Sequence, residues 1–163
     1  MPAGATYEPL ATTTLSTATA SVTFSSISGS YTDLVLVVSG QTTSGSNNLR
    51  YYYNSDNTSA LYSRTTLYGD GTSAVSSRST GSNYNFAADA TTTQSPNIIN
   101  IFNYANSNVF KTSLIRGGAA NAYAITRVNL WRNTNAITSI TVETDGSTYA
   151  SGSTFTLYGI KAA

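Results

Sequence analysis

The chain contains neither cysteine nor histidine. Without cysteine it has no disulfide framework and no thiol chemistry, and without histidine it lacks the commonest general base and the commonest metal ligand. A serine nucleophile needs a base and an orienting partner, and the lysines, Lys111 and Lys161, stand in no recognisable nucleophile motif. We therefore expect a protein that is not an enzyme, with no catalytic residue and no cofactor.

Charged residues are scarce, at 9% of the chain, against about 25% in an average soluble domain. With a net charge of +1 and arginines scattered from Arg50 to Arg132, the chain has no basic patch for nucleic acid. Low charge also weakens repulsion between identical copies packed side by side. These features argue against a nucleic-acid partner and favour a homo-oligomer.

The 7 acidic residues are few and dispersed. Glu143 and Asp145 would share one face of an extended strand, but a tight turn at residues 145–146 explains the second carboxylate more simply. Residues 54–57, Asn-Ser-Asp-Asn, offer oxygen ligands without the spacing of a calcium loop and are typical of a turn. We expect neither a glycosidase carboxylate pair nor a metal site.

Long apolar runs are missing too, and no stretch is long enough to span a membrane. The first residues carry no basic n-region and no apolar h-region, so we expect no signal peptide. A membrane partner is therefore not expected.

What fills the sequence instead is serine, threonine and tyrosine, with 12 tyrosines and with serine and threonine together at about a third of the chain. Threonine, tyrosine and valine favour strands, whereas exposed-face helix formers are nearly absent. Short apolar or alternating segments, each closed by a turn signal, predict strands. These segments are residues 21–24, 34–38, 49–53, 61–68, 98–104, 111–116, 124–131, 137–142 and 154–160.

About eight or nine strands without a helical segment predict an all-β protein, a jelly-roll-like antiparallel β-sandwich. The strand at 124–131 shows the alternation well, because its even and odd positions fall on opposite faces. No linker divides the chain, so we expect an extended N-terminal arm at 1–18 and a single β-sandwich domain at 19–163.

The expected arm has little periodicity, and Pro9 would be tolerated in an edge strand but not in a central one. Two interpretations stay open, a loose terminus or an arm that crosses to a neighbouring subunit. If the arm crosses, its contacts would come from Tyr7, Pro9, Leu10 and Leu15.

Residues 70–95 read as one long polar loop with a weak aromatic patch at Tyr84 and Phe86. A loop of this length in a compact domain is often functional, so it is either a binding loop or a structural excursion. The aromatic residues, Trp131 among them, have three possible roles: cross-strand packing, a subunit interface, or a platform for carbohydrate. Tyr84, Phe86 and Trp131 are accordingly candidate interface residues.

Short segments along most of the chain share one resemblance: residues 22–27, 31–36, 103–106, 130–132, 136–141 and 153–160. They resemble a family of small β-rich proteins of tailed bacteriophages, found especially in phages of cyanobacteria and marine bacteria. The similarity is weakest between residues 69 and 95. The resemblance implies a structural protein located in the virion and made in the bacterial cytoplasm.

Within that family two roles stay open. The first is a capsid decoration or cement protein, a homo-oligomer that stabilises the particle through contacts with the major capsid protein. The alternative is a tail fibre or tail-tip module that contacts tail proteins and binds a receptor or carbohydrate. The resemblance carries no active-site residue to this chain.

Overall fold

The computed structural model describes residues 6–161, and within them the chain forms twelve β-strands. The first six are β1 (Tyr7–Thr14), β2 (Ser21–Phe24), β3 (Asp33–Gly40), β4 (Leu49–Tyr53), β5 (Tyr62–Gly69) and β6 (Ala74–Ser82). The others are β7 (Asn85–Phe86), β8 (Ser95–Phe102), β9 (Lys111–Ala119), β10 (Tyr123–Trp131), β11 (Ile140–Thr144) and β12 (Thr154–Ile160). Within the described part of the chain, no helix has the length and apolar character needed to cross a membrane.

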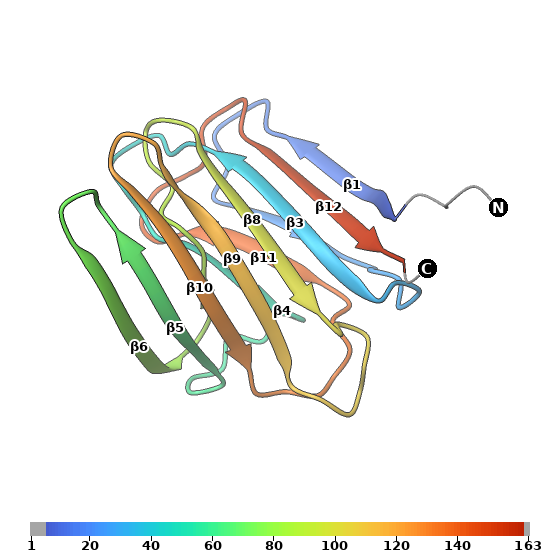
Figure 1. The fold of residues 1–163 in the computed structure, drawn as a ribbon. Coiled ribbons are helices and arrows are strands. Elements are labelled where there is room, and N and C mark those ends of the chain that lie inside the picture. Colours follow the sequence, from blue (N-terminus) through green and yellow to red (C-terminus); the bar gives the residue numbers. More distant parts are fainter. Residues whose placement is uncertain (1–5, 162–163) are drawn as a thin grey trace.

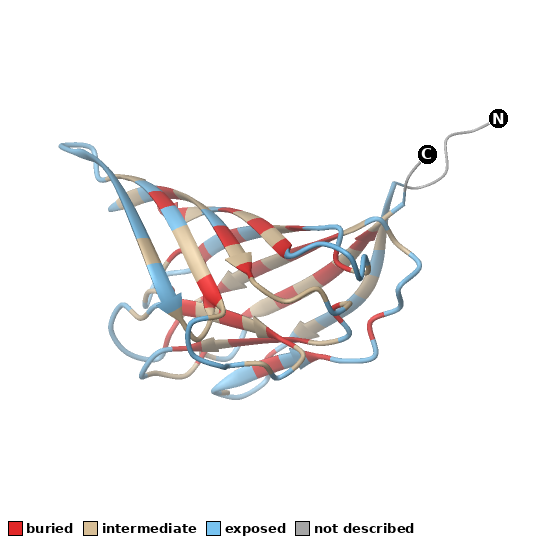
Figure 2. Ribbon diagram, turned by 90° about the horizontal axis from the view of Figure 1, so that it is seen from below, coloured by how far each residue is buried: buried red, intermediate tan, exposed pale blue. Residues whose placement is uncertain are grey.

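The strands form two antiparallel sheets that face each other (Figure 1 and Figure 2). The larger sheet has eight strands in the order β1-β12-β3-β8-β9-β10-β5-β6, and the smaller has four in the order β2-β11-β4-β7. Apolar side chains from both sheets make one buried cluster, in which the largest are Trp131, Tyr51, Tyr53, Tyr62, Tyr104 and Tyr149. The all-β antiparallel sandwich is therefore confirmed, while the jelly-roll arrangement stays a prediction.

Most predicted strands are present because alternation buries every second side chain. In β12, Phe155 and Leu157 are buried between partly exposed neighbours, as the period of two requires. Residues 34–38 were predicted to be buried on both faces, and β3 does lie inside the sheet with only Val37 partly exposed among them. Several boundaries differ; for example, β8 runs from Ser95 to Phe102, and β11 begins only at Ile140.

The predicted count of strands was too low, and the first missing strand lies in the segment expected to be an arm. Residues 7–14 form β1, which pairs with β12 from Tyr7↔Ile160 to Thr14↔Thr154. Residues 7–14 are therefore an edge strand of the chain's own sheet and not an extended arm. Residues 1–5 lie outside the described residues.

The expected long loop at 70–95 is also corrected, because it contains the strands β6 and β7. A tight turn starts β6: the Asp70 carboxylate accepts hydrogen bonds from the backbone N–H groups of Thr72 and Ser73 at 2.9 and 2.7 Å. These bonds hold the pKa of the Asp70 carboxyl far below its usual range. β6 escaped prediction because none of its residues is buried, so no face needs apolar side chains.

The two adjacent glycines near the end of β9 are explained by close backbone approaches. A Cβ at Gly117 would lie 2.6 Å from Asn97 Oδ1, and a Cβ at Gly118 would overlap the carbonyl oxygen of Tyr123. Gly118 also has a φ of 151°, which favours glycine. Gly118 therefore permits the close pairing of β9 with β10, and Gly117 permits the close approach of Asn97.

Candidate interaction surface

The side of the eight-stranded sheet that faces away from the four-stranded sheet is called the outer face. Strand register places its side chains in cross-strand rows. One row contains Tyr158, Val35, Asn100, Leu114, Val128 and Thr65. The next contains Thr156, Val37, Ile98, Arg116, Thr126 and Leu67. Figure 1 views the molecule from this side, and the four-stranded sheet lies behind.

The outer face exposes large apolar side chains. Leu67 is 61% exposed, Val128 50%, Ile98 37% and Phe102 36%. The charged residues in the two rows are Arg116 and, where the first row continues onto β6, Arg78; the Arg116 guanidinium donates to Asn100 Oδ1 at 3.3 Å. Large exposed apolar side chains that gather on one face of a sheet suggest a site of interaction more than scattered single residues do.

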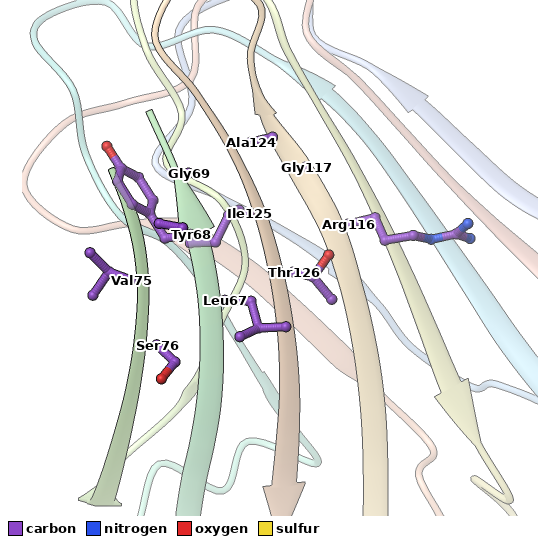
Figure 3. Close-up of a pocket in the computed structure, with 11 residues that line it drawn as sticks. Leu67, Tyr68, Gly69, Val75, Ser76, Arg116, Gly117, Ala124, Ile125 and Thr126 are labelled. Atoms are coloured by element: carbon purple, nitrogen blue, oxygen red, sulfur yellow. The ribbon is translucent and has the colours of Figure 1, made fainter. Parts of the chain in front are cut away.

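The outer face is hollowed where β9, β10, β5 and β6 meet. A third cross-strand row contains only small residues: Gly118, Ala124, Gly69 and Ala74. Beside this row lies a hollow of about 780 Å³, lined among others by Leu67 and Thr126. Figure 3 shows that the Arg116 side chain points away from the other lining residues, so the hollow presents mainly apolar surface.

The exposed side of the four-stranded sheet is different because its polar groups pair within the chain. Thr23 Oγ1 and Thr141 Oγ1 are 3.0 Å apart. Arg50 binds Glu143 at 2.5 Å and Asp145 at 3.1 Å. On this face the polar side chains bind one another, so it offers a partner less exposed apolar surface than the outer face does.

The four interface candidates from the expected arm are divided by the fold. Tyr7, 58% exposed, and Pro9 are accessible on edge strand β1. Leu10 is partly buried against the core, and Leu15 is buried. Tyr7 and Pro9 are therefore open to a partner, Leu10 is so only in part, and Leu15 is not accessible.

The structure brings Tyr84 and Phe86 together, with their rings edge to face at 5.6 Å. Each ring is covered by a guanidinium of the same chain: Arg50 lies 4.4 Å from the centre of the Tyr84 ring, and Arg64 lies 4.1 Å from that of Phe86. Such cation–π contacts stabilise the local structure. They also cover one face of each ring, which a carbohydrate could otherwise use.

Trp131 is not an interface residue, because its side chain is fully buried. Its ring stacks on that of Tyr62, with the ring centres 6.3 Å apart, and lies tilted against Tyr53, with the ring centres 5.3 Å apart. Its indole N–H donates to Asp56 Oδ2 at 3.0 Å. Of the three roles considered for the aromatic residues, packing is therefore the role of Trp131.

The bond from Trp131 to Asp56 gives a pH-dependent prediction. Burial alone would raise the pKa of Asp56, but hydrogen bonds from Thr58, Trp131 and Asn133 lower it. The ionised Asp56 carboxylate should stabilise the fold fully above the pKa of the unfolded state, about 3.9. This stabilisation should be lost as the pH falls through the lower pKa of the folded state. Because the chain has one tryptophan, we expect its fluorescence to change in that acid range.

The control is Asp56→Asn, whose side-chain oxygen can still accept the indole N–H but does not titrate. Emission should be recorded from pH 6 down to about pH 2, with circular dichroism to monitor unfolding. An identical acid transition in Asp56→Asn would show that another group causes it.

Sequence reasoning missed the part played by Lys111. Its side chain is 1% exposed, and its ammonium donates to the carbonyl oxygens of Asn106, Val109 and Thr134 at 2.6, 2.8 and 2.8 Å. Burial lowers the pKa of Lys111. The lysine fixes a loop that exposes Val109 by 41% and Phe110 by 52%. That apolar pair within a polar segment was the only sequence signal for this loop.

Within residues 6–161 no three acidic side chains gather as metal ligands would. Comparison of the chain with protein-family models, curated proteins and solved structures finds no match. The outer face is therefore the structural feature from which a proposal about function can start.

Proposed function

We propose that this chain is a non-enzymatic structural protein of a bacteriophage particle, attached to neighbouring protein subunits through its outer face. The observation that carries the proposal is the set of exposed apolar side chains on the outer face, which includes Leu67, Val128 and Ile98 from two adjacent rows. Burying apolar surface in a contact stabilises that contact by about 25 cal/mol per Å² of surface. The sequence resemblance to phage proteins supplies the context, with capsid decoration as the favoured role.

The dimensions of the outer face suit a protein partner. Eight strands about 4.8 Å apart, each about 25 Å long, give a face of roughly 900 Å². A specific protein–protein interface buries about 800 Å² on each partner. The face is therefore large enough for a stable contact with one subunit of a particle.

A carbohydrate-binding tail module has less support. Trp131 and Tyr62 are buried in the core, and the ring of Tyr84 lies under Arg50. A sugar-binding platform needs an open aromatic face.

The proposal predicts that added charge on the outer face prevents attachment. In the double variant Leu67→Asp/Val128→Asp, both substituted positions are at least half exposed, so folding should be preserved while a buried contact would be lost. We expect the amount of this variant in purified particles to fall at least about tenfold, measured by mass spectrometry against the major capsid protein.

The matched control, Ser21→Asp/Ser25→Asp, adds the same charge at exposed positions in and beside the four-stranded sheet and should leave occupancy unchanged. Equal occupancy of the two double variants would contradict docking through the outer face. Particles free of the wild-type chain would contradict the virion role itself.

A further inference from the structure

Three of the four sheet edges are short or interrupted. In the four-stranded sheet, the edge strands β2 and β7 have only 4 and 2 residues. In the eight-stranded sheet, β1 has Pro9 and an irregularity between Pro9 and Ala11. Lys161 also binds Glu8 at 2.6 Å beside this strand. Short strands, proline, bulges and charges are the devices by which proteins prevent strand pairing at an edge.

The fourth edge, β6, has a long unprotected stretch. It has 9 residues, and it contains no proline and no lysine. Its irregularity lies at one end, opposite Tyr62 and Ser63, and leaves the pairing with β5 regular from Ala74 to Thr80. Among residues 6–161, no strand pairs with its other side. Figure 2 shows β6 as an exposed strand at the margin of the molecule.

The turn before β6 shows which backbone groups of β6 point away from β5. The N–H of Asp70 donates to the carbonyl of Ser73 at 3.3 Å, so these residues form a hydrogen-bonded pair. Hydrogen-bonded and non-hydrogen-bonded pairs alternate along an antiparallel ladder. The residues whose N–H and C=O groups point outward are therefore Ala74, Ser76, Arg78 and Thr80.

From this geometry we propose that β6 pairs with β6 of a second copy, antiparallel about a twofold axis, and joins two eight-stranded sheets into one. In the register centred on Ser76, outward groups of each strand meet those of the other and form about six main-chain hydrogen bonds. The proposal goes beyond attachment to a particle, because it assigns a self-association edge that operates in the isolated protein.

The distribution of charge favours a second copy as the partner. Arg78 is the only charged residue in β6, and the register centred on Ser76 places it opposite Ala74, so the two guanidinium groups stay apart. The edge of β1 is a poor partner because Pro9 removes a donor and the irregularity after it breaks the ladder. The net charge of +1 adds little repulsion between copies.

Ser76→Pro tests the proposal directly. The Ser76 N–H points away from β5, so proline there should leave the β5–β6 ladder intact and remove a donor at the centre of the new interface. By sedimentation velocity, the wild-type chain should approach twice its mass of 17.1 kDa as concentration rises. Ser76→Pro should raise the dissociation constant at least about tenfold, whereas Ser76→Ala should leave it unchanged.

Two further variants separate pairing from a fault in folding. Ser76→Lys keeps the backbone donor but places two ammonium groups across the twofold axis, so its dimer should weaken at low salt and recover at high salt. Thr12→Lys makes the same change on the exposed edge of β1 and should leave dimerisation intact. A wild-type monomer at all concentrations up to about 100 µM, or a dimer lost in Thr12→Lys but kept in Ser76→Pro, would overturn the proposal. Either result leaves docking through the outer face to be judged separately by particle occupancy.

Discussion

Replacing Lys111 with methionine is expected to lower the free energy of unfolding by about 3 kcal/mol. Methionine keeps much of the apolar stem but leaves the carbonyls of Asn106, Val109 and Thr134 without their common donor. Each buried carbonyl without a partner costs about 1–3 kcal/mol, less where water reaches it. Urea unfolding followed by tryptophan fluorescence measures the loss.

The matched control for Lys111 is Lys161→Met, because Lys161 is an exposed lysine in a surface ion pair with Glu8. Exposed ion pairs contribute little to stability, so this variant should unfold at nearly the wild-type urea concentration. If both lysine variants unfold at the same concentration, the three-carbonyl site does not stabilise the fold in the way described here.

Trp131→Ala should cost about 4 kcal/mol of stability, as large-to-small changes of buried aromatic residues do. The substitution leaves a cavity beside Tyr53 and Tyr62 and removes the donor to Asp56. Because the variant contains no tryptophan, thermal unfolding should be followed by circular dichroism.

Trp131→Phe separates packing from hydrogen bonding. Phenylalanine retains most of the ring contact with Tyr53 and Tyr62 but not the indole N–H, so its loss should be about half that of Trp131→Ala. If Trp131→Ala unfolds like the wild-type chain and remains competent for assembly, Trp131 cannot be the central packing residue described here.

The sandwich separates two kinds of surface. One side of the molecule satisfies its polar groups internally, with Arg50 as the clearest case. The other side, the outer face, leaves Leu67 and Val128 open. Together with the free edge of β6, this arrangement gives the chain two independent routes to assembly, and each route has its own variants and its own measurement.

Alternation predicted β4, β10 and β12 because one face of each strand is buried. The same logic failed for β6, in which most side chains are small and polar and none is buried. It failed also for β1, where Pro9 and the following irregularity disturb the period. Sequence patterns detect strands through burial, so an exposed edge strand leaves little trace.

The sequence by itself determined that the chain is an all-β protein with alternating strands, because threonine, tyrosine and valine fit a pleated sheet and helix formers are scarce. It also determined that positions 124, 126, 128 and 130 share one face of β10 and that the odd positions share the other. A period of two does not say which of these faces is inside.

Only the tertiary structure decided which face of β10 is inside, and the inner face is the one that carries two polar residues. Ala124 and Val128 point outward, while the polar Arg127 and Asn129 lie inside. They are tolerated there because Arg127 donates to the carbonyl of Ala87, and Asn129 donates to Tyr51 and to the carbonyl of Phe86, each at 2.9 Å. Buried polar groups are stable when hydrogen-bonded, and those partners, distant in sequence, exist only once both sheets have come together.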